Sequence, residues 1–539
     1  MADWSDAHLS EMRLRGENAN PQEEAARLAT ARAVILQTVK STALTHEQKV
    51  ATLAHQATDL LEVLDKTPEL RELLEQPIDK QCICDLNEGH APLCPRYIIP
   101  DYARLMRDGC QFLRLAPPRD LYEAIDTLLV FYKHVPSVTN YPVFVGQLDE
   151  LLEPFVDTVD EPTAKKLIRL FLRHIDRTVL DSFAHANIGP RASRVGYMIL
   201  EACADLQDAV PNLTLKYDPN VTDDDFARAC VQCALRCAKP SFANHCIYKK
   251  EWGEEYAVAS CYNALPVRGG SFTLSRLILG NIAKKARNTA DFLENILPQS
   301  MRVMRDYMNE RIRFIAQESG FFAPSGNFLV REGFVERERF TAMFALVGLA
   351  EAVNHLEQGE PEGAGRRFGH DAHANALGAR IVKDIYDFTQ QQTANPYCTD
   401  IIGGHFALHA QVGLAEDVGV SPGVRIPIGE EPENLADHLR VLAKLHKYFP
   451  AGVGDIFPLD TTVERNPDYV LDIVKGAFSA DLRYLSFFGA DSDVVRITGY
   501  LAKRSDMEKL AQGQAVMHDT TALGLGASQN GHALDRRRI

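Results

Sequence analysis

The chain has 539 residues, and its 58 Lys and Arg against 73 Asp and Glu give a formal net charge of −15. Hydrophobic residues make up 46% and charged residues 24%, the composition of a globular protein with a large core. The acidic balance argues against general nucleic-acid binding, and no apolar run reaches the roughly 18 residues of a membrane-spanning helix.

The amino-terminal segment MADWSDAHLSEMRLRGEN is polar and acidic, so it does not fit a signal peptide. Without an export signal, the eleven cysteines are expected to be reduced, and their odd number leaves at least one unpaired. We therefore expect a cytoplasmic protein that binds neither a membrane nor nucleic acid. Each of its thiols either packs in the core or takes part in chemistry.

Helical patterns dominate the first part of the chain. Within residues 1–80, apolar side chains recur three and four positions apart, which predicts a helical platform. Prolines and a glycine interrupt residues 82–101 (CICDLNEGHAPLCPRYIIPD) and predict a loop. Helical patterns return over residues 102–209, and the alternation at 213–217 predicts a half-buried strand.

The second part mixes short strands with long helices. Thr222 and Asp225 resemble a capping box that opens a helix. We expect short strands and loops up to Gly270, long helices from there to about Glu318, and an apolar helix over residues 339–356. Short strands among long helices, with no internal repeat or low-complexity linker, predict one large α/β domain.

The segment RITGY at residues 496–500 places a glycine in a setting that suits radical chemistry. Removing an α-hydrogen from Gly499 leaves a radical flanked by an amide nitrogen and a carbonyl, and both groups delocalise the unpaired electron. Such a centre is planar, and glycine lacks the Cβ that would crowd it. Five residues alone also fit an ordinary turn glycine, so this interpretation needs a second feature.

Cys261 supplies that second feature. A radical stored on a glycine must pass to a thiol, because a thiyl radical is the reagent that abstracts hydrogen from a substrate. Cys261 lies in YAVASCYNALPVRGGSFTL, between small apolar residues and a Pro-x-x-Gly-Gly stretch, which predicts a loop tip with an inward thiol. Cys246, beside His245 in NHCIY, is its main competitor.

Three segments in this order resemble the glycyl radical enzyme superfamily: PNLTLKY, SCYNALPVRGGSFTLSRLILG and RITGYLAKRSD. RITGY matches the family's R-V-x-G-Y fingerprint with Ile for Val, and Gly499 lies 40 residues from the carboxyl end, as is typical there. Together with CDLNEGHAPLCPRYIIPDY, these segments make the chain most similar to the YjjI family, from about residue 82 to residue 510.

The resemblance implies an α/β fold, a ten-stranded glycyl-radical-enzyme barrel of two five-stranded halves surrounded by helices, with a helical N-terminal region. The implied parts are a helical region over residues 1–80, a catalytic barrel with the cysteine loop over 81–480, and a glycyl radical loop region over 481–539. Gly499 would store the radical and Cys261 would carry it as a thiyl.

The resemblance also implies the partners. No cofactor would be bound, because a radical S-adenosylmethionine iron–sulfur activase would install the radical on the glycine. The protein would be a homodimer that acts on a small molecule. Its chemistry would be anaerobic, since a carbon radical traps O₂ and the chain then breaks at the glycine.

Three departures from the superfamily narrow the reaction. Asn263 stands two residues after Cys261, where dehydratases and decarboxylases commonly carry a Glu. Ser260 and Tyr262 flank Cys261, so the paired cysteines of pyruvate formate-lyase are absent. No cysteine follows Cys398, so the four-cysteine zinc site of anaerobic ribonucleotide reductases is missing. We expect lyase-type cleavage or elimination on a small polar substrate, with a ribonucleotide-reductase-like oxidoreductase or a non-catalytic binding protein as alternatives.

The loop at residues 85–96 (DLNEGHAPLCPR) is dense in polar groups and prolines. Such a loop offers candidate substrate contacts, here Asp85, Glu88, His90 and Arg96, and Asn263 is a fifth candidate. The alternative interpretation is a surface loop with solvated acids and a paired arginine.

Other cysteines carry weaker signals. Cys230, Cys233 and Cys237 share one helix face, which favours packing of small hydrophobic side chains over a metal site. Loop packing is also favoured for Cys82, Cys84 and Cys94. We therefore expect no metal.

Overall fold

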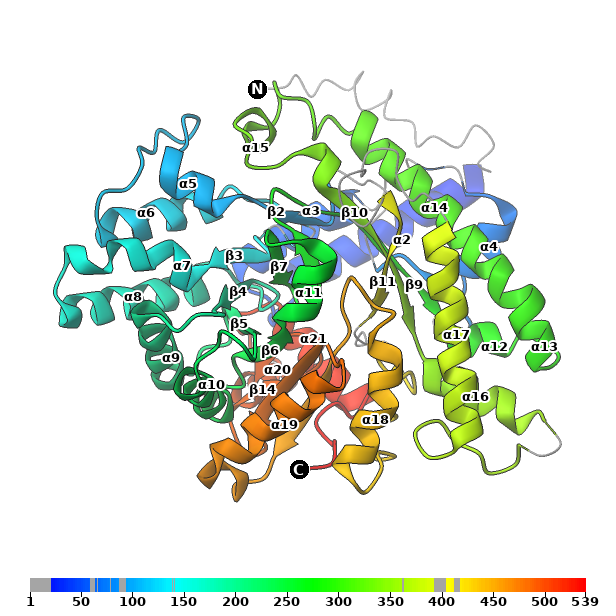
Figure 1. The fold of residues 1–539 in the computed structure, drawn as a ribbon. Helices are drawn as coiled ribbons and strands as arrows, with labels where there is room; N and C mark the ends of the chain where they lie inside the picture. The colour runs from blue at the N-terminus through cyan, green and yellow to red at the C-terminus, as the bar shows by residue number, and fades with distance from the viewer. Residues whose placement is uncertain are drawn as a thin grey trace.

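Figure 1 shows the computed structural model, which describes residues 21–58, 64, 66–77, 79–86, 94–137, 139, 141–360, 363–391, 404–411 and 417–539. Strands run through the middle of the molecule and helices cover them on both sides (Figure 1). Across these residues, we find no helix that combines the length and the apolar character needed to cross a bilayer. The mixed α/β class predicted from the sequence is confirmed.

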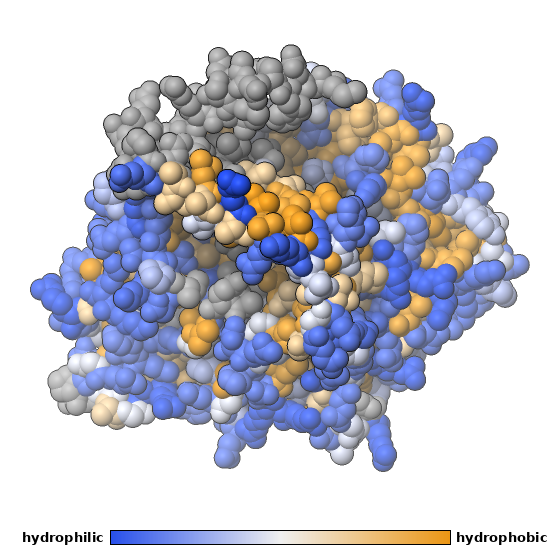
Figure 2. Space-filling view, turned by 180° about the vertical axis from the view of Figure 1, so that it is seen from behind, coloured by the Kyte–Doolittle hydropathy of each residue, from blue (hydrophilic) through white to orange (hydrophobic). Residues whose placement is uncertain are grey.

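The described residues of the amino-terminal segment contain helices, which agrees with the periodicity there. These helices are α2 (Pro21–Lys40), α3 (His46–Thr58) and α4 (Pro68–Leu74). Helices α2 and α3 lie towards the back of Figure 1 and keep several apolar side chains exposed: Leu28, Val34, Leu36, Val39 and Val50. Figure 2 views the molecule from behind and shows apolar side chains gathered in the upper half of that face.

A six-stranded sheet forms one half of the interior. Its strand order is β12 (Asp455–Leu459), β13 (Tyr484–Gly489), β6 (Ser241–Asn244), β5 (Asn212–Tyr217), β4 (His185–Ile188) and β3 (Phe144–Gln147). Strands β3 to β6 pair in parallel, and β13 pairs antiparallel with β6. The strand predicted at 213–217 is therefore β5, which begins one residue earlier and is buried throughout, so the predicted half-burial is wrong.

Helices connect and cover these strands. They are α5 (Tyr102–Asp108), α6 (Leu121–Tyr132), α7 (Leu148–Leu152), the 3₁₀ helix η1 (Glu153–Thr158), α8 (Glu161–Thr178), α9 (Arg194–Leu206) and α10 (Asp224–Cys237). The N-cap of α10 is Asp223, whose carboxylate accepts from the amides of Asp225 and Phe226, so the capping box predicted at Thr222 is wrong by one position.

A five-stranded sheet forms the other half. Strand β9 (Gly269–Ile278) pairs in parallel with β10 (Phe340–Val347), which pairs in parallel with β11 (Ala407–Ala410). The short strands β1 (Ile83–Cys84) and β2 (Tyr97–Ile99) pair antiparallel with β9. On this side lie α12 (Leu279–Ala283), α13 (Thr289–Asp291), the π-helical η2 (Phe292–Ile296), α14 (Leu297–Gln317), η3 (Arg337–Arg339), α16 (Leu349–Gln358) and α17 (Ala372–Gln391). The short helix α15 (Phe328–Arg331) instead packs through Phe328 against Phe131 of α6.

The apolar helix predicted at 339–356 is wrong in its first half. There the chain forms strand β10, and only α16 is helical. Every residue of β10 is buried, and a parallel strand buried on both faces is continuously apolar, so it lacks the alternation that identifies a strand. Strand β9, which we expected to belong to the helices after Gly270, is also buried throughout, but the SFTLS part of its sequence alternates polar and apolar residues and so does carry a strand pattern.

The remaining elements are α11 (His245–Trp252), α18 (Leu435–His446), η5 (Val463–Arg465), α19 (Pro467–Ser479), α20 (Arg504–Ala511) and α21 (Thr520–Asn530). Two hairpins, β7 (Tyr256–Ala259) with β8 (Asn263–Pro266) and β14 (Val494–Arg496) with β15 (Leu501–Lys503), carry the two sequence motifs. No strand pair in the described part of the chain joins the two large sheets, so a closed ten-stranded barrel stays a prediction.

Candidate active site

Cys261 lies at the tip of the β7–β8 hairpin, between the two sheets. Strand β7 contacts β3 and β4 of the six-stranded sheet, whereas β8 contacts β9 and β10 of the five-stranded sheet. Ala259 pairs with Asn263, so the turn is tight, and Ser260 takes a positive φ of 59° to make it. All residues of both strands are buried. The loop tip and inward thiol predicted from the sequence are what the hairpin provides.

Gly499 lies in the turn between β14 and β15, against Cys261. A Cβ built on Gly499 would lie 1.8 Å from the Cβ and 3.1 Å from the Sγ of Cys261. No side chain fits there, and the α-carbon of Gly499 is one covalent bond from that position. The structure thus places the backbone of residue 499 within direct reach of the sulfur of residue 261, with both residues buried.

Strand β5 holds the glycine turn in place. The side-chain amide of Asn212 donates to the carbonyl of Gly499 at 3.0 Å. Arg496 in turn donates to Asn212 Oδ1 at 2.9 Å and to the carbonyl of Ala238 at 2.8 Å. Asn212 belongs to the PNLTLKY segment, but nothing local in the sequence shows that it bonds a residue 287 positions away.

Two groups hold the carbonyls of the cysteine turn. The Nδ1 of His185 lies 3.2 Å from the carbonyl of Ser260, and its Nε2 lies 2.7 Å from Thr214 Oγ1. The hydroxyl of Tyr484 donates to the carbonyl of Cys261 at 3.1 Å. Burial lowers the pKa of His185 to about 3, so this histidine is neutral at physiological pH.

The thiol of Cys261 stays protonated. Burial raises its pKa to about 11, against weaker opposing effects from neighbouring backbone amides and arginines. The sulfur donates to Asn263 Oδ1 at 3.0 Å. An intact S–H bond suits hydrogen-atom transfer, whereas a nucleophilic cysteine would need a lowered pKa.

Arg425 lies near the ring of Tyr262, the residue that follows Cys261. Its guanidinium carbon is 5.9 Å from the ring centroid of Tyr262, and its Nε donates to the carbonyl of Gly454 at 3.0 Å. The ring of His409 approaches Tyr262 as well, with centroids 5.5 Å apart. Nothing in the sequence pointed to Arg425 or His409, because neither lies in a recognisable motif.

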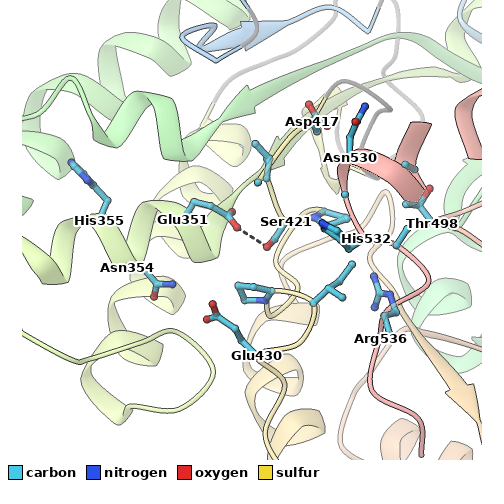
Figure 3. Close-up of a pocket in the computed structure, with 18 of the residues that line it drawn as sticks. Glu351, Asn354, His355, Asp417, Ser421, Glu430, Thr498, Asn530, His532 and Arg536 are labelled. Carbon is cyan, nitrogen blue, oxygen red and sulfur yellow. Dashed lines mark hydrogen bonds between the residues drawn. The ribbon is translucent and has the colours of Figure 1, made fainter. Parts of the chain in front are cut away.

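A pocket of about 460 Å³ reaches the residue before Gly499 (Figure 3). It is bounded by α16, by the segment that contains Ser421, and by the carboxyl-terminal part of the chain, including Thr498 and Arg536. Ser421 donates to Glu351 at 2.6 Å across its wall (Figure 3). The glycine turn therefore borders a cavity at Thr498.

Of the residues predicted to contact substrate, one lies at Cys261 and the other described ones lie elsewhere or have other partners. Asn263 lies at the cysteine, but Asp85 accepts from the hydroxyl of Tyr307 at 3.0 Å and lies 3.8 Å from Arg311 on α14. Arg96 stacks on Tyr97, with 5.3 Å from its guanidinium carbon to the ring centroid. Glu88 and His90 lie outside the described residues. A substrate role for this loop stays a prediction.

The other cysteines discussed above do not share the position of Cys261 beside Gly499. Cys246 is exposed on α11 and does not compete for the position beside Gly499. Cys230, Cys233 and Cys237 are buried on α10, as the packing interpretation predicts. In the part of the chain that the structure describes, no three His, Cys, Asp or Glu side chains are grouped so as to hold a metal ion.

Comparison with known proteins identifies the family. Residues 44–539 match the family model described as glycyl radical enzyme YjjI-like. The chain belongs to the YjjI-like glycyl radical enzyme family. It is 44% identical over 509 residues to an uncharacterised protein of Haemophilus influenzae, covering 93% of this chain and 96% of that protein. It is 40% identical over 503 residues to YjjI of Escherichia coli, covering 93% and 95%.

Solved structures of glycyl radical enzymes share the fold of this YjjI-like chain. The anaerobic ribonucleotide reductase of Thermotoga maritima with dATP in its specificity site superposes with a TM-score of 0.65 at 12% identity, covering 91% of this chain and all of that one. The Roseburia inulinivorans enzyme of 1,2-propanediol dehydration gives 0.61 at 11% identity, covering 94% and 88%. A glycyl radical enzyme of Archaeoglobus fulgidus gives 0.57 at 13%, covering 76% and 68%. At these identities the likeness extends to the fold alone.

Proposed function

We propose that this protein stores a radical on Gly499 and passes it to Cys261, whose thiyl form abstracts hydrogen from a small substrate. The observation that carries the proposal is the contact between the two residues, with no room for a side chain at 499. Family membership supports it independently.

The steps exchange one hydrogen atom at a time. A partner activase of the radical S-adenosylmethionine class removes a hydrogen atom from the α-carbon of Gly499. The S–H bond of Cys261 then breaks, its hydrogen moves to that α-carbon, and a thiyl radical remains. The thiyl takes a hydrogen atom from a substrate C–H bond, the substrate radical fragments or eliminates, and the product radical recovers the hydrogen from the thiol.

The geometry supports the exchange between Gly499 and Cys261. The hydrogen-bonded turn around Gly499 holds a planar centre without a Cβ, and burial of both turns keeps water and O₂ away from the radical. The raised pKa keeps the transferable hydrogen on Cys261.

Cleavage or elimination by a lyase is our leading reaction class. Asn263 lies at the thiol but its amide cannot take a proton, which disfavours the base-assisted dehydration that a Glu at this position would support. An oxidoreductase of the ribonucleotide reductase kind is the second candidate, favoured by the fold likeness. The sequence has no cysteine after Cys398 to form that enzyme's zinc site, and this favours the lyase. A homodimer is proposed on family resemblance.

Electron paramagnetic resonance tests the proposal. Anaerobic incubation with the activase and S-adenosylmethionine should give an organic doublet from one α-hydrogen. Gly499→Ala should abolish the signal, while Gly476→Ala, at a glycine with no neighbouring atom within 4 Å of the added Cβ, should retain it. A doublet that persists in Gly499→Ala would assign the radical to another residue.

A further inference from the structure

Two of three buried guanidinium groups share one carboxylate, and the third has none among the described residues. Arg425, Arg496 and Arg536 are 2%, 0% and 8% exposed. Asp455 lies 3.5 Å from Arg425 and 3.0 Å from Arg536, and no described carboxylate pairs with Arg496. Buried charges are normally paired, so this region carries an excess of positive charge.

Among the described residues, Arg496 leaves Nε and one terminal nitrogen without a hydrogen-bond partner, and Arg425 leaves both of its terminal nitrogens without one. The Nε of Arg425 is bonded to a carbonyl. Asp455 is itself held by His438 at 2.9 Å and by Arg536, so its charge is already shared. Two buried donors of a planar guanidinium thus face no acceptor, a costly arrangement unless an anion fills it.

The position of Arg425 places its two unpaired terminal nitrogens near the residue that follows Cys261. The guanidinium lies under the ring of Tyr262, the residue next to Cys261. The charges of Arg425 and Arg496 both reach the sulfur, since each opposes the burial that raises the pKa of Cys261.

Two neutral side chains, one beside the ring of Tyr262 and one at the thiol of Cys261, also have polar atoms without described partners. His409 directs Nδ1 at the carbonyl of Ala451, 3.2 Å away, so Nδ1 carries the proton and Nε2 is an acceptor. That Nε2 is buried without a described partner, as is the Nδ2 donor of Asn263. Burial lowers the pKa of His409 to about 3 and keeps it neutral.

We propose that the substrate is a small anion that also carries a hydroxyl group, with its oxyanion on Arg425 and its hydroxyl donating to His409. A hydroxy acid and a phosphorylated polyol share this chemistry, because a guanidinium binds carboxylate and phosphate alike. The reaction that follows rests on the proposed function, whereas the binding does not.

Binding to the full-length protein without a radical tests the inference. Calorimetry compares two matched pairs, lactate with propane-1,2-diol and glycerol 3-phosphate with glycerol. At least one anion should bind at least about tenfold more tightly than its neutral partner, and the pair that shows this preference distinguishes carboxylate from phosphate. Equal affinities in both pairs, or no binding of either anion, would overturn the proposal.

Variants of Arg425 decide whether this residue is responsible. Arg425→Met and Arg425→Gln should each remove the preference for the anion, and Arg425→Lys should retain part of it. The control is Arg483→Met, which removes a buried guanidinium fully paired with Glu251. It should keep the preference. A preference unchanged in the folded Arg425→Gln protein would refute the assignment.

A stability readout separates a binding role from a structural one. Arg425 leaves donors unpaired, so Arg425→Met in ligand-free protein should leave the melting temperature unchanged or raise it, whereas Arg483→Met should lower it. A clear loss of stability in Arg425→Met alone would mark Arg425 as structural and overturn the proposal. Since no radical is involved in binding or in melting, these outcomes are independent of the electron paramagnetic resonance experiment on Gly499.

Discussion

The contact between the two turns predicts a specific steric coupling. In Gly499→Ala the new Cβ would lie 1.8 Å from the Cβ of Cys261, so the turns must separate by about 1.6 Å to reach an ordinary contact of 3.4 Å. Overpacking of this kind in a rigid interior costs roughly 1–3 kcal/mol. We therefore expect Gly499→Ala to lower the free energy of unfolding by about that amount without any activase present.

A double-mutant cycle isolates this cost. Cys261→Gly removes the Cβ and sulfur that the new methyl group would strike, so it should recover at least about 1 kcal/mol when combined with Gly499→Ala. Denaturant unfolding of the four proteins gives the coupling energy. The matched control is Gly476→Ala, which meets no atom and should be neutral or slightly stabilising.

The cycle has a clear negative outcome. If Gly499→Ala is as stable as the parent protein and its effect is independent of residue 261, the two turns do not touch in solution. The basis of radical transfer between them would then be removed.

Three further predictions follow from the site. Asn212→Ala should cost roughly 1–3 kcal/mol in urea unfolding and reduce the yield of radical, because the carbonyl of Gly499 loses its donor and Arg496 loses an acceptor. Wild-type stability and yield would contradict this. At pH 8, iodoacetamide should label exposed Cys246 well before Cys261, because the pKa of about 11 keeps the thiol of Cys261 protonated. Peptide mass spectrometry measures the order of labelling, and faster labelling of Cys261 would contradict its burial. Acid should destabilise the protein below about pH 6.5, because three buried histidines stay neutral in the folded protein but bind protons when it unfolds. Each should lower the free energy of unfolding by roughly 2 kcal/mol between pH 7 and pH 5. His446→Gln should lower the pH of half-unfolding, and an unchanged midpoint would refute this for His446. The three histidines are His185, His409 and His446.

Local structure was predictable from the sequence. The amino-terminal helices, strand β5 and the Cys261 turn follow from patterns that act over a few residues. The pairing of Cys261 with Gly499 also followed, although the two lie far apart in sequence, because radical transfer requires a thiol beside the glycine.

Long-range and fully buried features were not predictable. Strand β10 is apolar on both faces, so its sequence resembles a buried helix until β9 and β11 are seen to pair with it. Arg425 is a candidate binding residue because its terminal nitrogens have no described hydrogen-bond partner. Only the three-dimensional packing shows this.

The transfer of hydrogen between Cys261 and Gly499 can be observed directly by isotope exchange. The S–H hydrogen of Cys261 exchanges with solvent, so repeated transfer in D₂O should replace the α-hydrogen of Gly499 with deuterium. The resonance doublet of the activated protein should then collapse to a singlet in D₂O, whereas Cys261→Ser should keep its doublet. A doublet that survives in the parent protein, or a collapse that persists in Cys261→Ser, would contradict the transfer.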